Sequence, residues 1–268
     1  MSMRDFRFAD DTPAAWTYHR GTARWLFNAS SGGESPPVVP GREDGGLSWT
    51  PLPDGPALGV RLDEALLGRV SCRRFRVDAV PLAVLSALLS AGYGSESRSG
   101  PVLQDRPVPS GGGLYPLELS LLVRAVDGLL PGVYHYVPAA RGLELVRAVE
   151  LPRAFITYLF MGQPWVAEAA LVAVISFVGG RSLTKYGDRG YRYALLEAGH
   201  VMQNLNLAAS ALGLGCVNLG GFYDDELATL AGIDIEQEIP LYCSAIGVPD
   251  AEPSDRMATR ALERGTSP

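Results

Sequence analysis

The chain has 268 residues, of which 47% are hydrophobic, and its formal net charge is −6 at neutral pH. A chain of this length and apolar content can bury a substantial core, and we expect one large domain rather than two small ones. The acidic balance provides no basic field for nucleic acid or anionic lipid, so the expected partner is a small molecule or another protein.

The N-terminus, MSMRDFRFADD, is charged throughout and lacks the apolar core of a signal peptide. No apolar run approaches the ~20 residues that a membrane-spanning helix needs. We therefore expect a cytoplasmic protein that binds neither a membrane nor nucleic acid.

In chain order, residues 1–57 combine aromatic residues with a Gly-, Pro- and Ser-rich stretch, which predicts an arm and a loop ahead of a single domain over 58–268. Apolar residues at helical spacing, together with helix stop signals, predict helices over 60–68, 81–91, 191–212 and 224–232. Apolar or alternating runs predict strands over 117–126, 169–178 and 241–248 and a hairpin over 132–149. This mixture indicates an α+β or mixed α/β fold.

Several common sequence motifs are absent from the chain. It lacks the P-loop, the G-x-S-x-G motif of α/β-hydrolases and the H-E-x-x-H motif of zinc proteases, and LGLGCVNLGG fails the dinucleotide-binding pattern because Asn218 replaces its third glycine. The histidines lie in unrelated elements and the cysteines are far apart, so we expect no metal site and reduced thiols: His19, His135, His200, Cys72, Cys216 and Cys243.

Three short stretches remain as candidates for chemistry. The run PSGGGLYP, residues 109–116, is either a turn or a cradle that lets backbone approach a ligand closely. In GRVSCRRF, residues 68–75, Arg and Ser side chains suit a phosphate or a flavin edge, although a solvated basic turn would look the same. The third stretch contains Lys185, the one lysine among 23 basic residues, beside Tyr186. A lysine can lose its proton and act as a base where arginine cannot, but a single lysine must also fall somewhere by chance.

The order of the motifs along the chain closely resembles the SagB-type dehydrogenases of the nitroreductase superfamily. The motifs are YHxxT (18–22), RxSxRxF (69–75), RxxPSGGGLYPLE (106–118), KYGDRGYRYxLLEAGHxxQNL (185–205), then GLG and GGF. This resemblance covers nearly the whole chain. It implies an α+β nitroreductase-like fold, with a central, mainly antiparallel sheet surrounded by helices, and a homodimer that binds FMN at its interface.

The resemblance also implies roles for individual residues. It places the catalytic pair at Lys185 and Tyr186. It makes the glycine run a cradle for the flavin, and its full set of FMN-binding candidates is Arg69, Val70, Ser71, Arg73, Arg106, Pro109, Ser110, Gly111, Gly112, Gly113, Leu114, Gln203, Gly220 and Gly221. The family pattern usually supplies one more basic residue for the phosphate after the last strand, whereas here the first basic residue is Arg256.

The activity implied is the oxidation of thiazoline or oxazoline rings in a peptide natural-product precursor to thiazole or oxazole. Lys185 would remove the ring Cα proton with help from Tyr186, FMN would take a hydride, and oxygen would reoxidise it. A cyclodehydratase or a carrier would supply the substrate. Two alternatives stay open, an NAD(P)H-dependent nitro or enone reductase and a flavin-less scaffold of a peptide-modifying complex.

Overall fold

The computed structural model describes residues 14, 17–18, 20, 47–95 and 106–250. Their centre is a seven-stranded sheet in which every neighbouring pair of strands is antiparallel. The spatial order is β1-β4-β3-β2-β5-β7-β6. The strands are β1 (Ser48–Pro51), β2 (Leu117–Val123), β3 (Gly132–Val137), β4 (Gly142–Ala148), β5 (Leu171–Val178), β6 (Gly215–Leu219) and β7 (Glu238–Gly247).

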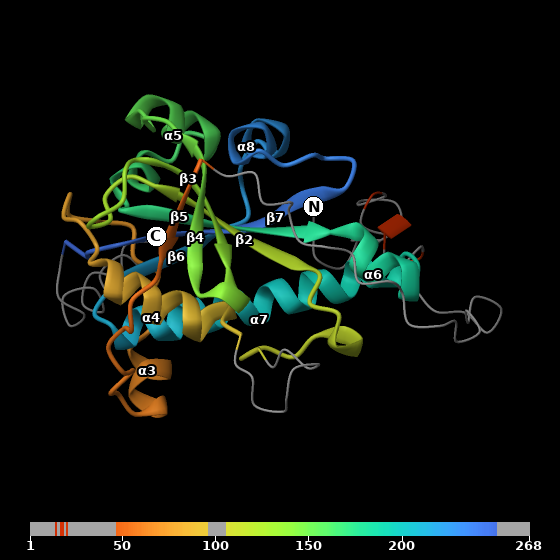
Figure 1. Ribbon diagram of the computed structural model, residues 1–268, viewed down its shortest axis with the longest axis horizontal. Coiled ribbons are helices and arrows are strands. Elements are labelled where there is room, and N and C mark those ends of the chain that lie inside the picture. The colour runs from red at the N-terminus through yellow and green to blue at the C-terminus, as the bar shows by residue number, and fades with distance from the viewer. Residues whose placement is uncertain (1–13, 15–16, 19, 21–46, 96–105, 251–268) are drawn as a thin grey trace, which may run out of the picture.

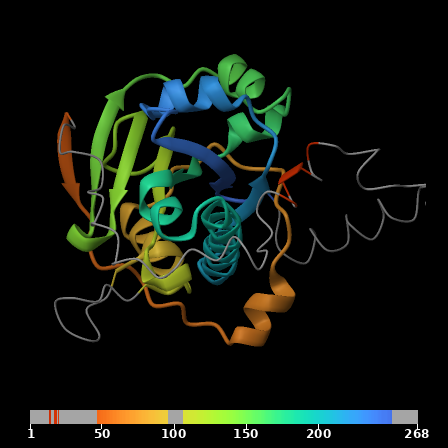
Figure 2. The same ribbon diagram turned by 90° about the vertical axis from the view of Figure 1, so that its right-hand side faces the viewer.

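Helices cover both faces of this sheet (Figures 1 and 2). One core cluster packs strand residues against α4 (Leu82–Tyr93) and α7 (Arg189–Ala211). A second cluster packs the alternate strand residues against α5 (Arg153–Leu159) and α8 (Asp224–Ala231). In β5, for example, Ala173 and Ile175 belong to the first cluster, and Val172 and Val174 to the second. The helices are α3 (Leu62–Gly68), α4 (Leu82–Tyr93), α5 (Arg153–Leu159), α6 (Gly179–Tyr186), α7 (Arg189–Ala211) and α8 (Asp224–Ala231), with short 3₁₀ turns η1 (Gly111–Gly113), η2 (Pro138–Ala140) and η3 (Pro164–Glu168).

The α+β fold with a central antiparallel sheet is confirmed. The predicted helices α3, α4, α7 and α8, the hairpin β3–β4 and strands β2, β5 and β7 form within a few residues of their expected bounds. The loop expected before residue 57 contains the edge strand β1, which pairs with β4 and ends at Pro51, a residue that an edge strand tolerates. Elements α5, α6 and β6 were not predicted.

Some sequence expectations fall outside the described residues. They concern most of the N-terminal arm, including His19 and Thr22, and the candidate phosphate ligand Arg256. Within the described part of the chain, no helix has the length and apolar character needed to cross a membrane. All three cysteines carry free, buried thiols.

Candidate active site

The glycine run forms a tight turn that is held together by the residue before it. The Gly113 amide donates to the Ser110 carbonyl oxygen at 3.1 Å, and the Tyr115 amide donates to the Ser110 hydroxyl at 2.9 Å. Gly112 and Gly113 have φ values of +67° and +66°, in the left-handed region that glycine adopts without a steric penalty. The run is therefore a turn whose backbone only glycine accommodates easily.

The same turn allows a close approach by side chains from elsewhere in the chain. A Cβ atom on Gly112 would clash with the Tyr186 hydroxyl and would lie 3.0 Å from Lys185 Nζ. A Cβ on Gly111 would lie 3.3 Å from the ring of Tyr193. By contrast, a Cβ on Gly113 would meet open space. The glycines thus lie directly against the Lys185–Tyr186 pair.

Lys185 and Tyr186 are the last two residues of α6, which ends at Gly187 with a φ of +55°. The Tyr186 ring packs edge-on against Tyr193 of α7, with ring centroids 5.1 Å apart. Lys185 Nζ lies 5.4 Å from the Tyr186 ring centroid, and the lysine side chain is exposed in the single chain. The edge-on contact of Tyr186 with Tyr193 fixes the end of α6, and the Lys185 amine remains accessible to a bound molecule.

A buried carboxyl group, which the sequence motifs do not indicate, is hydrogen-bonded to Ser110 at the start of this turn. Glu197 of α7 is only 2% exposed, and it accepts hydrogen bonds from the Tyr93 hydroxyl at 3.1 Å and from Ser110. Burial raises the pKa of Glu197 to about 6, although both hydrogen bonds and the Arg106 charge act to lower it. A signal was present in the sequence, because Glu197 falls at helical spacing among the apolar residues of α7, beside Ala194.

Arg106 is held between two aromatic rings. Its guanidinium lies 4.2 Å from the Tyr93 ring centroid and 5.2 Å from that of Tyr115, and Nη1 donates to the Tyr93 carbonyl oxygen at 3.3 Å. Its Nε is buried and has no hydrogen-bond partner among the described residues. The structure therefore gathers one group of predicted site residues around the turn: Arg106, Pro109, Ser110, Gly111, Gly112, Gly113, Leu114, Lys185 and Tyr186.

A second group of predicted residues lies along the edge strand β6. Ser71 bridges to Cys216 of β6, and the Cys72 amide donates to the Cys216 carbonyl oxygen at 3.0 Å. The side chains of Ser71 and Arg73 are exposed, and the Arg73 guanidinium lies 5.8 Å from the Trp165 ring centroid. The same strand leads into the predicted glycine pair, which completes the group: Arg69, Val70, Ser71, Arg73, Gly220 and Gly221.

The glycine turn and the segment of residues 69–73 lie toward opposite ends of α7. Gly111 contacts Tyr193 near the start of the helix, and a Cβ on Gly68, next to the second group, would lie 3.7 Å from the Ser210 hydroxyl near its end. A separation of 17 residues corresponds to about 25 Å along a helix axis. Gln203 lies between the two groups with its side chain exposed. Within one chain, the glycine turn therefore lies apart from residues 69–73, whereas Gly220 and Gly221 follow Asn218, which accepts a hydrogen bond from Asn206 of α7 at 2.8 Å.

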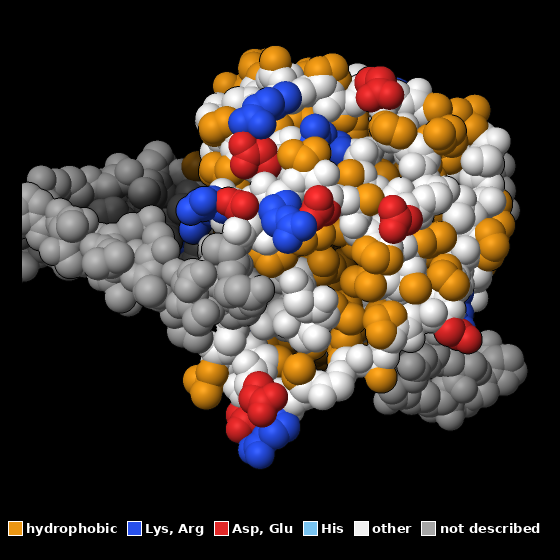
Figure 3. Space-filling model, turned by 90° about the vertical axis from the view of Figure 1, so that its left-hand side faces the viewer, with side chains coloured by type: hydrophobic (Ala, Val, Ile, Leu, Met, Phe, Trp, Pro, Cys, Tyr) orange, Lys and Arg blue, Asp and Glu red, His pale blue; other side chains and the backbone are white. Residues whose placement is uncertain are grey.

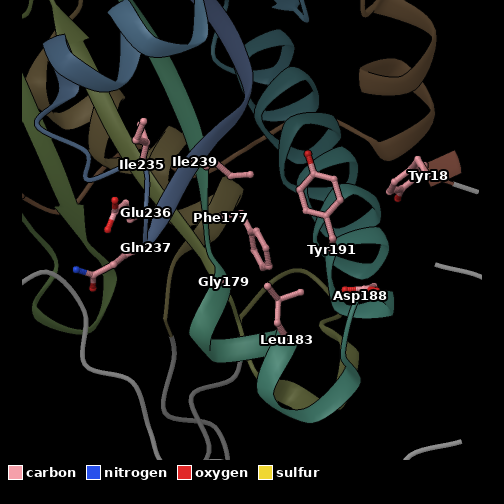
Figure 4. Close-up of a pocket in the computed structure, with 10 residues that line it drawn as sticks. All are labelled: Tyr18, Phe177, Gly179, Leu183, Asp188, Tyr191, Ile235, Glu236, Gln237 and Ile239. Carbon is pink, nitrogen blue, oxygen red and sulfur yellow. The ribbon is translucent and has the colours of Figure 1, made fainter. Parts of the chain in front are cut away.

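An apolar cavity of about 420 Å³ lies between α6, the start of α7 and the adjoining ends of β5 and β7 (Figure 4). Phe177, Leu183, Tyr191 and Ile239 provide most of its apolar lining. The sequence does not indicate this cavity, because its walls combine the consecutive elements β5, α6 and α7 with Tyr18 and with residues 235–239, which are distant in the chain.

A larger hollow of about 750 Å³ lies between α3, α4 and the second half of α7. Helix α3 extends from the body of the molecule (Figure 1). Its leucines are largely exposed to solvent, with 69% of the surface of Leu62, 50% of Leu66 and 78% of Leu67 accessible. Figure 3 shows hydrophobic side chains interspersed over one face of the molecule. Such exposure of large apolar residues on one short helix is typical of a surface that another protein covers.

The fold and these residues define a class of protein. The sheet order, the helices on both faces and the glycine turn packed on a long central helix form the nitroreductase-like α+β fold. Residues 66–248, more than half of the chain, match the Nitroreductase family. The chain therefore belongs to the nitroreductase family, a family of oxidoreductases whose members bind FMN.

Two relatives show how far the similarity extends. The nitroreductase-like protein MJ1384 of Methanocaldococcus jannaschii is 36% identical over 188 residues, which cover 70% of this chain and 91% of that protein. The microcin B17-processing protein McbC of Escherichia coli is 32% identical over 146 residues, which cover 53% of this chain and 54% of McbC. The match to McbC thus spans about half of each protein.

Solved structures resemble this chain over a larger share of its length. A nitroreductase-like protein from Ralstonia eutropha has a TM-score of 0.65 at 27% identity and covers 83% of this chain and 97% of that one. A chain of the E. coli microcin synthetase McbBCD complex with truncated pro-MccB17 bound has a TM-score of 0.59 at 25% identity, covering 92% of this chain and 86% of that one.

Proposed function

We propose that this protein is an FMN-dependent dehydrogenase that converts thiazoline or oxazoline rings of a peptide precursor to thiazole or oxazole. The observation that carries the proposal is the contact of Gly112 with the Lys185–Tyr186 pair, which joins a potential base to the glycine turn. The similarity to McbC, a processing protein of microcin B17, supports a peptide substrate. The similarity to a chain of the peptide-bound McbBCD complex supports the same conclusion and favours partner proteins such as a cyclodehydratase or a carrier.

The residues present fit FMN. The open space beside Gly113 leaves room for a flat ring against backbone, and the buried Nε of Arg106 is a donor that a flavin could engage. Arg69, Ser71 and Arg73 offer charged and hydroxyl donors of the kind that bind a phosphate. When bound, FMN would supply the acceptor for the two electrons of the oxidation.

The separation of the two groups along α7 favours a homodimer as the working unit. In a two-fold assembly, the glycine turn of one chain can meet the Ser71 and Arg73 segment of its partner, so that one flavin contacts both. The exposed leucines of α3 and the hollow beside it offer the apolar surface that such a dimer needs. We therefore propose that the complete site forms across the dimer interface.

The chain's own residues would carry the proton chemistry. Lys185 would remove the proton from the ring Cα of the azoline, because its amine is the basic side chain nearest to the glycine turn among the described residues. An amine acts as a base only in its unprotonated form. The Tyr186 hydroxyl would orient the ring or the amine from its fixed position against Gly112.

A direct test uses synthetic peptides that contain one thiazoline or one oxazoline. Incubation with the purified flavoprotein in air should lower the peptide mass by two hydrogens, as measured by mass spectrometry. A matched peptide with unmodified cysteine or serine should keep its mass. A flavin-loaded protein that leaves every azoline peptide unchanged, with and without added partner proteins, would contradict the proposal.

A second candidate is an NAD(P)H-dependent nitro or enone reductase, favoured by the match to MJ1384 over 91% of that protein's length. This function would use the same fold but a different electron donor. Rapid bleaching of the flavin by NADPH in the absence of peptide, followed by reduction of a nitroarene, would support it.

A further inference from the structure

A buried chain of ionisable side chains runs from the sheet to α6, and the proposed chemistry does not use it. In Glu118 of β2, the Oε1 atom lies 2.5 Å from Arg181 Nη2. The Oε2 atom of the same carboxylate lies 2.8 Å from His135 Nε2. The side chains of Arg181, Glu118 and His135 are only 12%, 10% and 5% exposed. On the far side, His135 Nδ1 lies 3.8 Å from Glu144 of β4.

The Glu118 carboxylate is well satisfied for a buried charge, whereas His135 Nδ1 is buried without a hydrogen-bond partner among the described residues. Both carboxylate oxygens of Glu118 have a partner, which is the condition under which a buried ion pair offsets the cost of its desolvation. Burial alone would raise the pKa of Glu118, but the hydrogen bond with His135 and the charge of Arg181 lower it to about 2. Glu118 therefore stays ionised at neutral pH, and Arg181 keeps its counter-charge.

Arg181 links three parts of the candidate active site. It lies in the first turn of α6, one helical turn before Lys185, so that the two side chains leave the same side of the helix. Its Nη1 donates to the carbonyl oxygen of Tyr115 at 3.3 Å. Tyr115 is in turn bound through its amide to Ser110 at the base of the glycine turn. One guanidinium thus connects α6, β2 and the glycine turn.

We propose that Arg181, held in place by Glu118, is a positioning residue that sets the distance of Lys185 and Tyr186 from the glycine turn. Helix α6 has eight residues, too few to be stable by itself, and it needs tertiary contacts to keep its geometry. A point charge could hold the helix near Glu118, but only the planar fork of arginine also reaches the Tyr115 carbonyl. The catalytic consequence rests on the proposed function, whereas the structural consequence does not.

Hydrogen exchange followed by mass spectrometry tests the positioning role without any substrate. In Arg181→Met, amides of residues 181–190 should exchange about tenfold faster or more, while those of β5 and the middle of α7 keep their protection. Arg181→Lys should restore much of the protection because it keeps the charge beside Glu118. The matched control is Arg153→Met, which breaks the exposed ion pair between Arg153 of α5 and Glu168 of η3 and should leave α6 unchanged.

Kinetics on an azoline peptide then separates positioning from simple stability. Arg181→Met should lower kcat about 10- to 100-fold with KM and FMN affinity nearly unchanged, since a small displacement of a base is costly for rate. If the single variant does not fold, Glu118→Gln/Arg181→Met removes both buried charges and should restore folding but not rate. Unchanged exchange in α6, or faster exchange with a normal kcat, would overturn the inference.

The two proposals fail in different ways. A wild-type protein inactive on azolines, with exchange in α6 still accelerated in Arg181→Met, would contradict the proposed function and leave the anchoring of α6 in place. Conversely, a wild type that is active on azolines, with the same exchange in α6 for the wild type and Arg181→Met, would contradict the anchoring of α6 and leave the proposed function in place.

Discussion

The Tyr186 hydroxyl lies so close to the backbone of Gly112 that a single added Cβ would collide with it. This contact joins the end of α6 to the glycine turn before β2, two segments that are far apart in the sequence. It makes Gly112 the position at which a minimal substitution acts on the Lys185–Tyr186 pair.

Gly112→Ala should displace Tyr186 and Lys185 and lower the rate of azoline oxidation about 10²-fold, as expected for a misplaced catalytic group. Gly128→Ala is the matched control, because Gly128 also has a positive φ, +79°, and its Cβ meets open space in a turn outside the candidate site. Both variants should lose about 1–2 kcal/mol of unfolding free energy from left-handed strain. Equal turnover numbers in the two variants would show that the contact with Tyr186 does not matter.

Lys185→Ala should bind FMN normally and lose about 10²–10⁴ in rate, because it removes the proposed base. Lys185→Arg should be similarly poor, since a guanidinium keeps its proton. Single-turnover kinetics with bound flavin measures the rate of azoline oxidation in each variant. A Lys185→Arg enzyme with nearly full activity would rule out the base and leave Tyr186 as the next candidate.

Arg73→Ala should weaken FMN binding about 10- to 150-fold, the effect of losing one charge-assisted hydrogen bond worth roughly 1.5–3 kcal/mol. Its neighbour Arg74 provides the control, because its guanidinium is paired with Asp250 at 2.8 Å. Fluorescence titration with FMN should therefore show a loss for Arg73→Ala and little change for Arg74→Ala. The same affinity in both variants would remove the segment around Ser71 from the site.

Glu197 should make stability depend on pH in a predictable direction. The pKa of Glu197 is raised from 4.5 to about 6 in the folded chain. Its contribution to the free energy of unfolding is therefore fully present below pH 4.5 and is lost as pH rises through 6. The difference is about 2 kcal/mol at pH 7. Denaturant titrations at pH 4.5 and 7 should show that Glu197→Gln lacks this decline. An identical decline in the variant and the wild type would refute the assignment.

Much of the fold could be predicted from local patterns. The apolar spacing of α7 and the uncharged run of β5 are strong signals because both elements are buried against the core. Helix α6 gave no comparable signal, since it is short and begins with Gly179 and Gly180. Strand β6, GCVNL, is brief and lies within a glycine-rich stretch, so its sequence pattern does not indicate a strand.

The candidate site could be predicted only in part. The glycine turn and the Lys185–Tyr186 pair were identified separately, and the structure shows that they touch. The separation of Ser71 from that turn follows from the length of α7 and its packing, which no motif encodes. The pairing of Arg181 with Glu118 depends on how α6 docks on β2, a long-range contact that the sequence pattern does not specify.

The most direct test of the account is anaerobic mixing of the flavin-loaded protein with one equivalent of a thiazoline peptide, with flavin absorbance and peptide mass followed together. The account predicts that the flavin bleaches without NADPH and that one thiazole forms per flavin reduced, whereas Lys185→Arg binds the peptide but does not bleach. Flavin that stays oxidised with the azoline peptide but bleaches at once with NADPH would contradict it.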